Sequence, residues 1–229
     1  MKNEYTKIGF TLAEILITLG IIGVVAAMTI PNLIATYKAK RYRSQFLKSY
    51  STIQQVFKRM ESDDISIDPA TYKPLTYYKT FQQYLNGSTD CGHAALKRPK
   101  PCRTYRYNGS DDYKNFSNTN KFTAGYLDDG SLLLQDGSIL YFENADNQTI
   151  FISVDLNGFT TPPNIAGHDL FTFQMIDGVI KPLGDKGTKF AASVDKYCSD
   201  TNKEVVNGMT CAYKALNDPT YFNKIVRNH

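Results

Sequence analysis

The clearest pattern along the chain is an apolar run from Phe10 to about Ala35, which follows a short polar stretch at the N-terminus. At about 1.5 Å per residue, a helix of this length crosses a hydrocarbon core of about 30 Å. Glu14 is the only residue in the run that can carry a charge, and Pro31 removes one backbone hydrogen bond deep inside the helix. The pattern predicts a membrane-spanning helix over about 10–35 that bends or locally melts near Pro31.

Beyond this run, the spacing of the large side chains becomes that of an amphipathic helix. Apolar and aromatic residues recur at alternating intervals of four and three, at Phe46, Tyr50, Ile53, Phe57 and Met60. A stripe of two heptads is short for a coiled coil, so we expect it to pack on a sheet of the same chain. Acidic residues and then Pro69 end the helical pattern. We therefore expect one helix over 10–60 and a globular head over 61–229.

The second half of the head has the pattern of short strands. Runs rich in β-formers, separated by turn sequences, lie at Ser131–Leu134, Ile139–Glu143, Thr149–Val154 and Phe171–Ile176. Asp136-Gly137 predicts a two-residue hairpin turn, and Asp177-Gly178 predicts the turn after the last run. A short helix is expected within 77–85. These elements predict an antiparallel meander with one face free to cover the long helix, which is an α+β architecture.

Four cysteines are present, and their intervals do not fit the common zinc spacings. Four cysteines allow three pairings. Closing short loops costs the least chain entropy, which favours Cys91–Cys102 and Cys198–Cys211. The alternative is four free, buried thiols. In an anchored chain, an even number of cysteines favours disulfides and an oxidising compartment.

Three interpretations of the N-terminus compete. The first is a cleaved secretory signal with a cut near Ala26-Ala27. The second is an ordinary single-span anchor. The third is a short leader followed by a helix that pairs with other helices. Glu14 discriminates between them, because a carboxylate inside a span is costly without a partner. A signal peptide or plain anchor does not need this residue, whereas a helix that pairs with an identical helix can use it.

The sequence Gly9-Phe10-Thr11-Leu12-Ala13-Glu14 resembles the processing and methylation site of type IV prepilins and type II secretion pseudopilins. The resemblance is strongest from Lys7 to about Tyr50. It implies a leader over 1–9, cut between Gly9 and Phe10 by a prepilin peptidase that then methylates the new amino group. It also implies that Glu14 neutralises the amine of an adjacent subunit and sets the register during assembly.

By the same resemblance, the fold is type IV pilin-like and the chain is a structural subunit of a pilus or a type II secretion pseudopilus. The expected partners are copies of itself, other pilins or pseudopilins, the prepilin peptidase and an inner-membrane assembly platform. The expected location is the bacterial inner membrane, with the C-terminal domain outside the cytoplasm, and then an extracellular or periplasmic filament. An alternative is a minor pilin-like adhesin or DNA-uptake module at a filament tip. The Tyr-rich middle of the chain and the C-terminal region with its predicted disulfide favour this alternative.

The distribution of basic residues opposes this orientation. Five basic residues follow the span, and two precede it, so the positive-inside rule places the C-terminal part in the cytoplasm. They are Lys38, Lys40, Arg41, Arg43 and Lys48 after the span, and Lys2 and Lys7 before it. The leader and the cysteines argue for the outside. A net charge of +4 is too small to indicate a nucleic-acid partner.

A loop between two predicted strands offers the strongest metal candidates. The segment 155–169 resembles a loop of pilin-like and pseudopilin-like domains, and its carboxylate and amide side chains are Asp155, Asn157, Asn164 and Asp169. In one interpretation these side chains satisfy backbone groups in tight turns. In the other, some of these oxygens hold Ca²⁺, as in certain pseudopilins. The segment is not an EF-hand, because the twelfth position from Asp155 is Ala166 rather than Glu.

An intrinsic catalytic role is not indicated. The three histidines, His93, His168 and His229, are isolated in the sequence. There is no Gly-rich phosphate loop and no Gly-x-Ser-x-Gly elbow. We therefore expect a chain that is not an enzyme, in which Gly9 and Phe10 are substrate positions for another protein.

Overall fold

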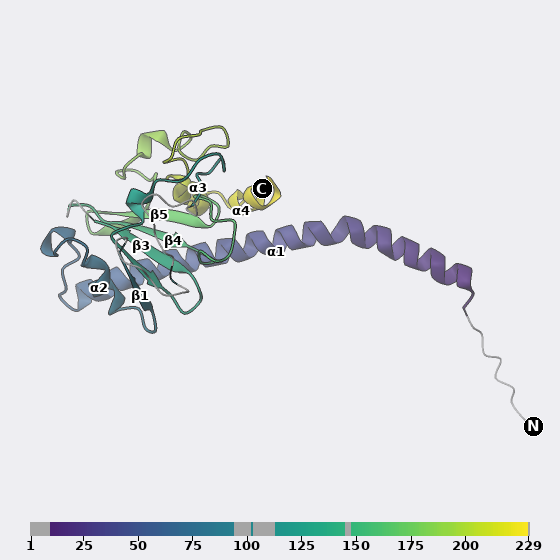
Figure 1. Ribbon diagram of the computed structural model, residues 1–229, viewed down its shortest axis with the longest axis horizontal. Coiled ribbons are helices and arrows are strands. Elements are labelled where there is room, and N and C mark those ends of the chain that lie inside the picture. Colours follow the sequence, from purple (N-terminus) through teal and green to yellow (C-terminus); the bar gives the residue numbers. More distant parts are fainter. Residues whose placement is uncertain (1–9, 94–101, 103–112, 145–147, 229) are drawn as a thin grey trace, which may run out of the picture.

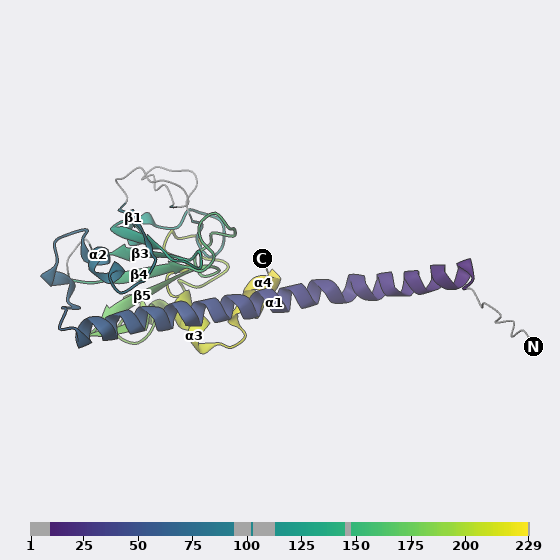
Figure 2. The same cartoon turned by 90° about the horizontal axis from the view of Figure 1, so that it is seen from below.

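The computed structural model describes residues 10–93, 102, 113–144 and 148–228. A single helix, α1 (Leu12–Ser62), has 51 residues. Its N-terminal half projects away from the rest of the chain, and its C-terminal half packs against a sheet (Figure 1 and Figure 2). The described chain therefore consists of a long helix with a head around its C-terminal half.

α1 is continuous through Pro31. The helix arches in Figure 1, so the predicted bend is found, whereas local melting is not. At the C-terminal end, the backbone N–H of Asp63 returns to the carbonyl of Arg59, and Asp64 takes a left-handed φ of 55°. These contacts satisfy the last helical carbonyls and end the helix close to where the acidic residues predict.

Six antiparallel strands form one sheet in sequence order. They are β1 (Thr89–Gly92), β2 (Gly130–Leu133), β3 (Ile139–Glu143), β4 (Phe151–Asp155), β5 (Leu170–Ile176) and β6 (Val179–Pro182). The meander is confirmed, and its four inner strands match the four predicted runs to within two residues at each end. The two edge strands, β1 and β6, are additions to the sequence prediction.

Two turns test the hairpin predictions. Asp177-Gly178 joins β5 to β6 as a two-residue turn with φ of 50° and 76°, because Ile176 pairs with Val179. The prediction of a two-residue turn at Asp136-Gly137 is wrong. The Leu134 N–H bonds to the Ser138 carbonyl, so the loop has three residues and ends at Gly137 with φ of 86°. A glycine in the left-handed region at the third position is typical of this longer hairpin.

Short helices complete the head. They are α2 (Tyr77–Gln82), α3 (Cys211–Asn217) and α4 (Tyr221–Asn228), with 3₁₀ turns at Pro69–Thr71, Ala124–Tyr126 and Ala191–Ser193. α2 confirms the helix expected within 77–85. α4 packs against α1 at the level where α1 leaves the head (Figure 1). α4 thus contacts α1 at the point where the projecting half of α1 begins.

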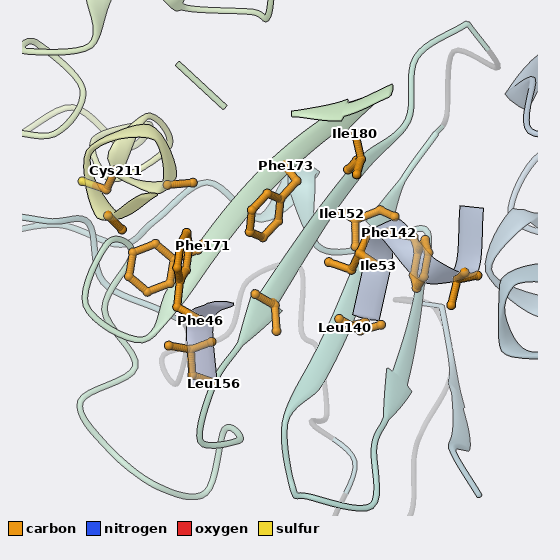
Figure 3. Packing of buried hydrophobic residues seen from close by; sticks show 14 of the residues in the cluster. Phe46, Ile53, Leu140, Phe142, Ile152, Leu156, Phe171, Phe173, Ile180 and Cys211 are labelled. Atoms are coloured by element: carbon orange, nitrogen blue, oxygen red, sulfur yellow. The ribbon is translucent and has the colours of Figure 1, made fainter. Parts of the chain in front are cut away.

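The main core lies between α1 and the sheet. Four of the five predicted stripe residues are buried, Tyr50 is half-buried and packed against them, and the buried face also extends back to Ala39 and Tyr42. The ring of Phe46 lies 4.9 Å from that of Phe171 and 5.8 Å from that of Phe173, centroid to centroid (Figure 3). The helical stripe therefore packs on the sheet, as its spacing predicts.

Both disulfides have the predicted pairing. Cys91 is bonded to Cys102 and Cys198 to Cys211, with Cα–Cα distances of 5.6 and 5.0 Å. No free cysteine remains in the chain. The disulfides support an oxidising compartment for the head.

Candidate functional site

The motif that resembles a prepilin processing site lies at the start of α1. Gly9 lies outside the described residues, whereas Phe10 is 85% exposed. Thr11 is the N-cap of α1, and its backbone N–H and hydroxyl both donate to Oε2 of Glu14 at 2.8 Å. The Glu14 N–H donates in return to the Thr11 hydroxyl oxygen at 3.2 Å. Glu14 therefore closes a capping box at the first turn, which the Thr-x-x-Glu spacing in the sequence could have revealed.

The N-terminal half of α1 exposes a continuous apolar surface. An 18-residue window of the helix has a mean hydropathy of 2.2, and none of it is buried inside the structure. Large apolar side chains stay exposed from Leu12 to Tyr37. By length and composition, this helix can cross a membrane. An exposed apolar surface of this size is typical of a site that interacts with a membrane or with another protein.

The segment 155–169 forms a compact loop in which side chains hold the backbone. Oδ1 of Asp155 accepts from the N–H groups of Asn157 and Gly158, at 3.1 and 2.9 Å. Its Oδ2 accepts from the hydroxyl of Tyr113. Gly158 has a φ of 78°, and a Cβ there would meet the Gly137 carbonyl oxygen at 2.4 Å. The loop therefore sits against the β2–β3 hairpin at a position that only glycine can occupy.

Asp169 closes the other end of the loop. Its two carboxylate oxygens accept from the N–H groups of Asn164 and Ile165, at 2.9 and 2.8 Å. Asp169 and Asp155 are both fully buried. Burial, together with the charge of Asp155, raises the pKa of Asp169 to about 7. The loop thus contains two neighbouring buried carboxyl groups, and the raised pKa of Asp169 favours protonation of that residue.

The four predicted calcium ligands do lie in this one loop. Two carboxylates and two amides are the hard oxygen donors that Ca²⁺ takes, and the Oδ1 atoms of Asn157 and Asn164 are buried without a hydrogen-bond donor. However, every carboxylate oxygen of Asp155 and Asp169 already accepts a hydrogen bond from the protein. The turns therefore account for the two acids without an ion, and calcium binding stays a prediction.

Three comparisons with known proteins found no match. Protein-family models, curated proteins and solved structures were all compared, and none matches. What the chain does must therefore be inferred from its own residues.

A second cluster of acids was not predicted from the sequence. Carboxylate oxygens of Asp128, Asp129 and Glu143 lie within 4.8 Å of one another beside the β2–β3 pair. Burial raises the pKa of Asp128, and Glu143 shares a hydrogen bond with it. The Asp129 carboxylate accepts from the backbone N–H of Asn144 at 2.7 Å. The sequence separates these acids by up to 15 positions, so only strand pairing brings them together.

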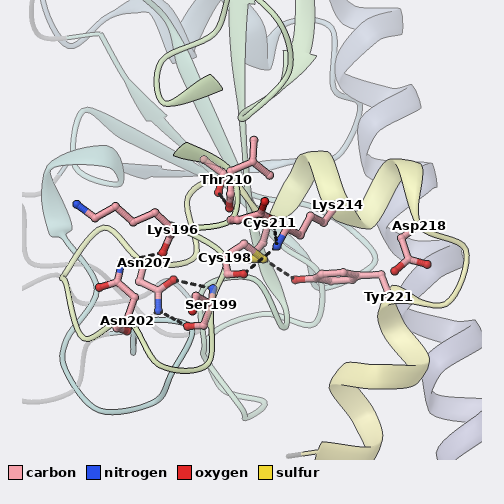
Figure 4. Close-up of polar contacts among 12 residues, drawn as sticks. Lys196, Cys198, Ser199, Asn202, Asn207, Thr210, Cys211, Lys214, Asp218 and Tyr221 are labelled. Carbon is pink, nitrogen blue, oxygen red and sulfur yellow. Dashed lines mark hydrogen bonds and ion pairs between the residues drawn. A yellow bond between two sulfur atoms is a disulfide. The ribbon is translucent and has the colours of Figure 1, made fainter. Parts of the chain in front are cut away.

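The C-terminal loop closed by the Cys198–Cys211 disulfide packs into the head. Asn207 organises it, because its side-chain amide donates to the carbonyls of Ser199 and Asn202 at 2.8 and 2.6 Å (Figure 4). The ammonium of Lys214 donates to the Cys198 carbonyl at 3.1 Å. Cys211 is fully buried and belongs to the main core. Deleting this loop would therefore disturb folding, so a binding role for it has to be tested at exposed side chains.

Proposed function

We propose that the chain is a structural subunit of a type IV filament, either a pilus or a type II secretion pseudopilus. Three observations support the proposal. The N-terminal motif resembles a prepilin processing site, the half of α1 that follows it is apolar and exposed, and a disulfide-bonded head packs on the other half. In this proposal α1 anchors the chain in the bacterial inner membrane, with the head outside the cytoplasm, until the subunit enters a filament.

The observation that carries the proposal is the single carboxylate of the apolar half. Glu14 is exposed and lies in the first turn of α1, one turn after Phe10. Cleavage after Gly9 would leave a positive amino group on Phe10. Since a charge within a membrane is costly, the Glu14 carboxylate of one copy and the Phe10 amine of the next would each relieve the other. An unpartnered apolar helix would thereby gain both a partner and a register.

The capping box allows the charge of Glu14 to be tested apart from its hydrogen bonds. Glu14→Gln keeps a side chain that can accept from Thr11, because Gln also serves in this box, but it removes the charge. Glu14→Ala removes both. In cells of the native host, we expect both variants to be processed and to reach the membrane at wild-type levels, and neither to enter filaments.

Filament content would be measured by shearing and sedimentation, with membrane content by immunoblot. Leu16→Ala, two residues along the same exposed segment, is the matched control and should assemble. Normal assembly of Glu14→Gln would show that the charge is not required. Normal assembly of Glu14→Ala would contradict the proposed role of this residue altogether.

A further inference from the structure

Six basic side chains gather where α1 enters the head. α1 carries no acidic residue between Glu14 and Glu61. Lys38, Lys40 and Arg41 are exposed, and none of them forms an ion pair with a described residue. We call the whole set the cationic collar; it consists of Lys38, Lys40, Arg41, Arg43, Lys224 and Arg227. Such a concentration of positive charge attracts anionic partners.

The four collar residues of α1 point in different directions around the helix. At about 100° per residue, Lys40, Arg41 and Arg43 lie roughly 200°, 300° and 140° from Lys38. The remaining sector, between about 0° and 140°, contains Ala39 and Tyr42, which are buried against the head. The charges therefore surround the axis on every side that the head leaves open.

α4 supplies cations on the side that the head covers. It packs against α1, and its Lys224 and Arg227 are exposed and line one groove together with Thr36 of α1. Lys224 is paired with Asp218 at 2.8 Å, whereas Arg227 has no ion pair within the described chain. α1 and α4 lie side by side where α1 leaves the head (Figure 1), so basic residues of both helices belong to this part of the molecule.

The level of the collar matches the surface of a membrane spanned by α1. The exposed aliphatic surface continues to Ile34, and Lys38 lies four residues further, a rise of about 6 Å. Long basic side chains extend from such a position into the headgroup layer. On the head side, Nη1 of Arg43 is buried and has no hydrogen-bond partner among the described residues.

We propose that the cationic collar binds the anionic phospholipid headgroups of the leaflet from which the head emerges. A planar layer of headgroups surrounds the helix and meets all sides of the collar, whereas a neighbouring subunit would meet only one side. This contact gives the basic residues an anionic partner on whichever side of the membrane the head lies. The inference rests on the proposed membrane anchorage and not on filament assembly.

The test uses the full chain in vesicles that contain equal amounts of phosphatidylglycerol and phosphatidylcholine. Electron paramagnetic resonance with a spin-labelled form of each lipid gives the ratio of their association with the protein. We expect phosphatidylglycerol to be favoured about threefold or more at low salt. The preference should fall towards one at about 1 M salt, where the Debye length is about 3 Å.

Two variants with the same loss of charge separate the collar from net charge. The collar variant combines Lys38→Gln, Lys40→Gln, Arg41→Gln and Arg227→Gln, and the control combines Lys58→Gln, Arg59→Gln, Lys73→Gln and Lys79→Gln. All eight side chains are exposed. The collar variant should lose the lipid preference and the control should keep it, with circular dichroism showing both folded.

Each result decides the question. Equal association of the two lipids with the inserted wild type would overturn the collar and leave the anchor standing. A lipid preference that survives in the collar variant would also overturn the collar. Salt-sensitive dimers that show no lipid preference would mean that a second copy of the chain, and not lipid, occupies the collar. A chain that does not insert into vesicles would overturn the anchor and the collar together. Since no assembly machinery is present, failure to form filaments cannot produce any of these results.

Discussion

Replacing Phe46 by Ala should remove much of the energy that holds α1 to the sheet. The Phe46 side chain is fully buried, and three rings surround it, with centroids 4.9 Å away at Phe171 and 5.8 Å away at Phe173 and Phe222. Truncating a buried Phe to Ala costs about 3–5 kcal/mol in all, and three aromatic pairs, each worth about 0.5–1.5 kcal/mol beyond area burial, place Phe46 in the upper part of that range. We therefore expect a loss of about 4–5 kcal/mol, a large share of the stability of an ordinary domain.

The assay is urea unfolding of the full chain in a mild nonionic detergent, followed by circular dichroism. Leu47→Ala is the matched control, because Leu47 is the next residue on the same helix and is 37% exposed. We expect the control to lose less than about 1 kcal/mol. If Phe46→Ala also lost less than about 1 kcal/mol, or no more than the control, the packing of α1 on the sheet described above would be refuted.

Three further predictions concern the loop and the second disulfide. Because the folded-state pKa of Asp169 is raised to about 7, by burial and by Asp155, its contribution to stability is present at low pH and is lost as pH rises towards 7. The free energy of unfolding should therefore fall by roughly 3 kcal/mol more between pH 5 and pH 8 in the wild type than in Asp169→Asn, and parallel pH profiles would argue against it. About 1 mM Ca²⁺ should leave the urea midpoint unchanged at pH 8, since turns account for the acids; a clear increase would instead establish the predicted calcium site. Replacing Cys198 and Cys211 by Ser opens a loop with a sequence separation of 13 and should cost about 3 kcal/mol, so an unchanged urea midpoint would contradict the closure argument.

Much of the fold could be predicted because single periodic patterns determine it. The four-three spacing of the α1 stripe depends only on the helix itself, so it correctly indicated which face packs on the sheet. The edge strands carry no such pattern. β1 is the short, polar Thr89–Gly92, and β6 ends in Pro182, a residue that sheets tolerate at an edge. Both are recruited as strands by their neighbours in the sheet rather than by their own residue pattern.

The candidate sites also differ in how far the sequence predicts them. The N-terminal motif is contiguous, so the sequence alone is enough to predict Phe10 and Glu14 as site residues. Their role in processing and filament assembly stays a prediction. The acids at Asp128 and Glu143 and the basic groups of α4 become neighbours of distant segments only through strand pairing and helix docking. No spacing rule links such positions, which is why the sequence showed only an excess of positive charge after the span and not its proximity to the basic residues of α4.

The most direct test of the proposed function is the intact mass and N-terminal sequence of the protein purified from membranes of its own host. We predict a chain that starts at N-methylated Phe10 and is two hydrogens lighter for each of its two disulfides. A chain that starts at Met1 would instead mean an ordinary anchor. A start after Ala27 would mean a secreted soluble domain, and either result would contradict a filament subunit.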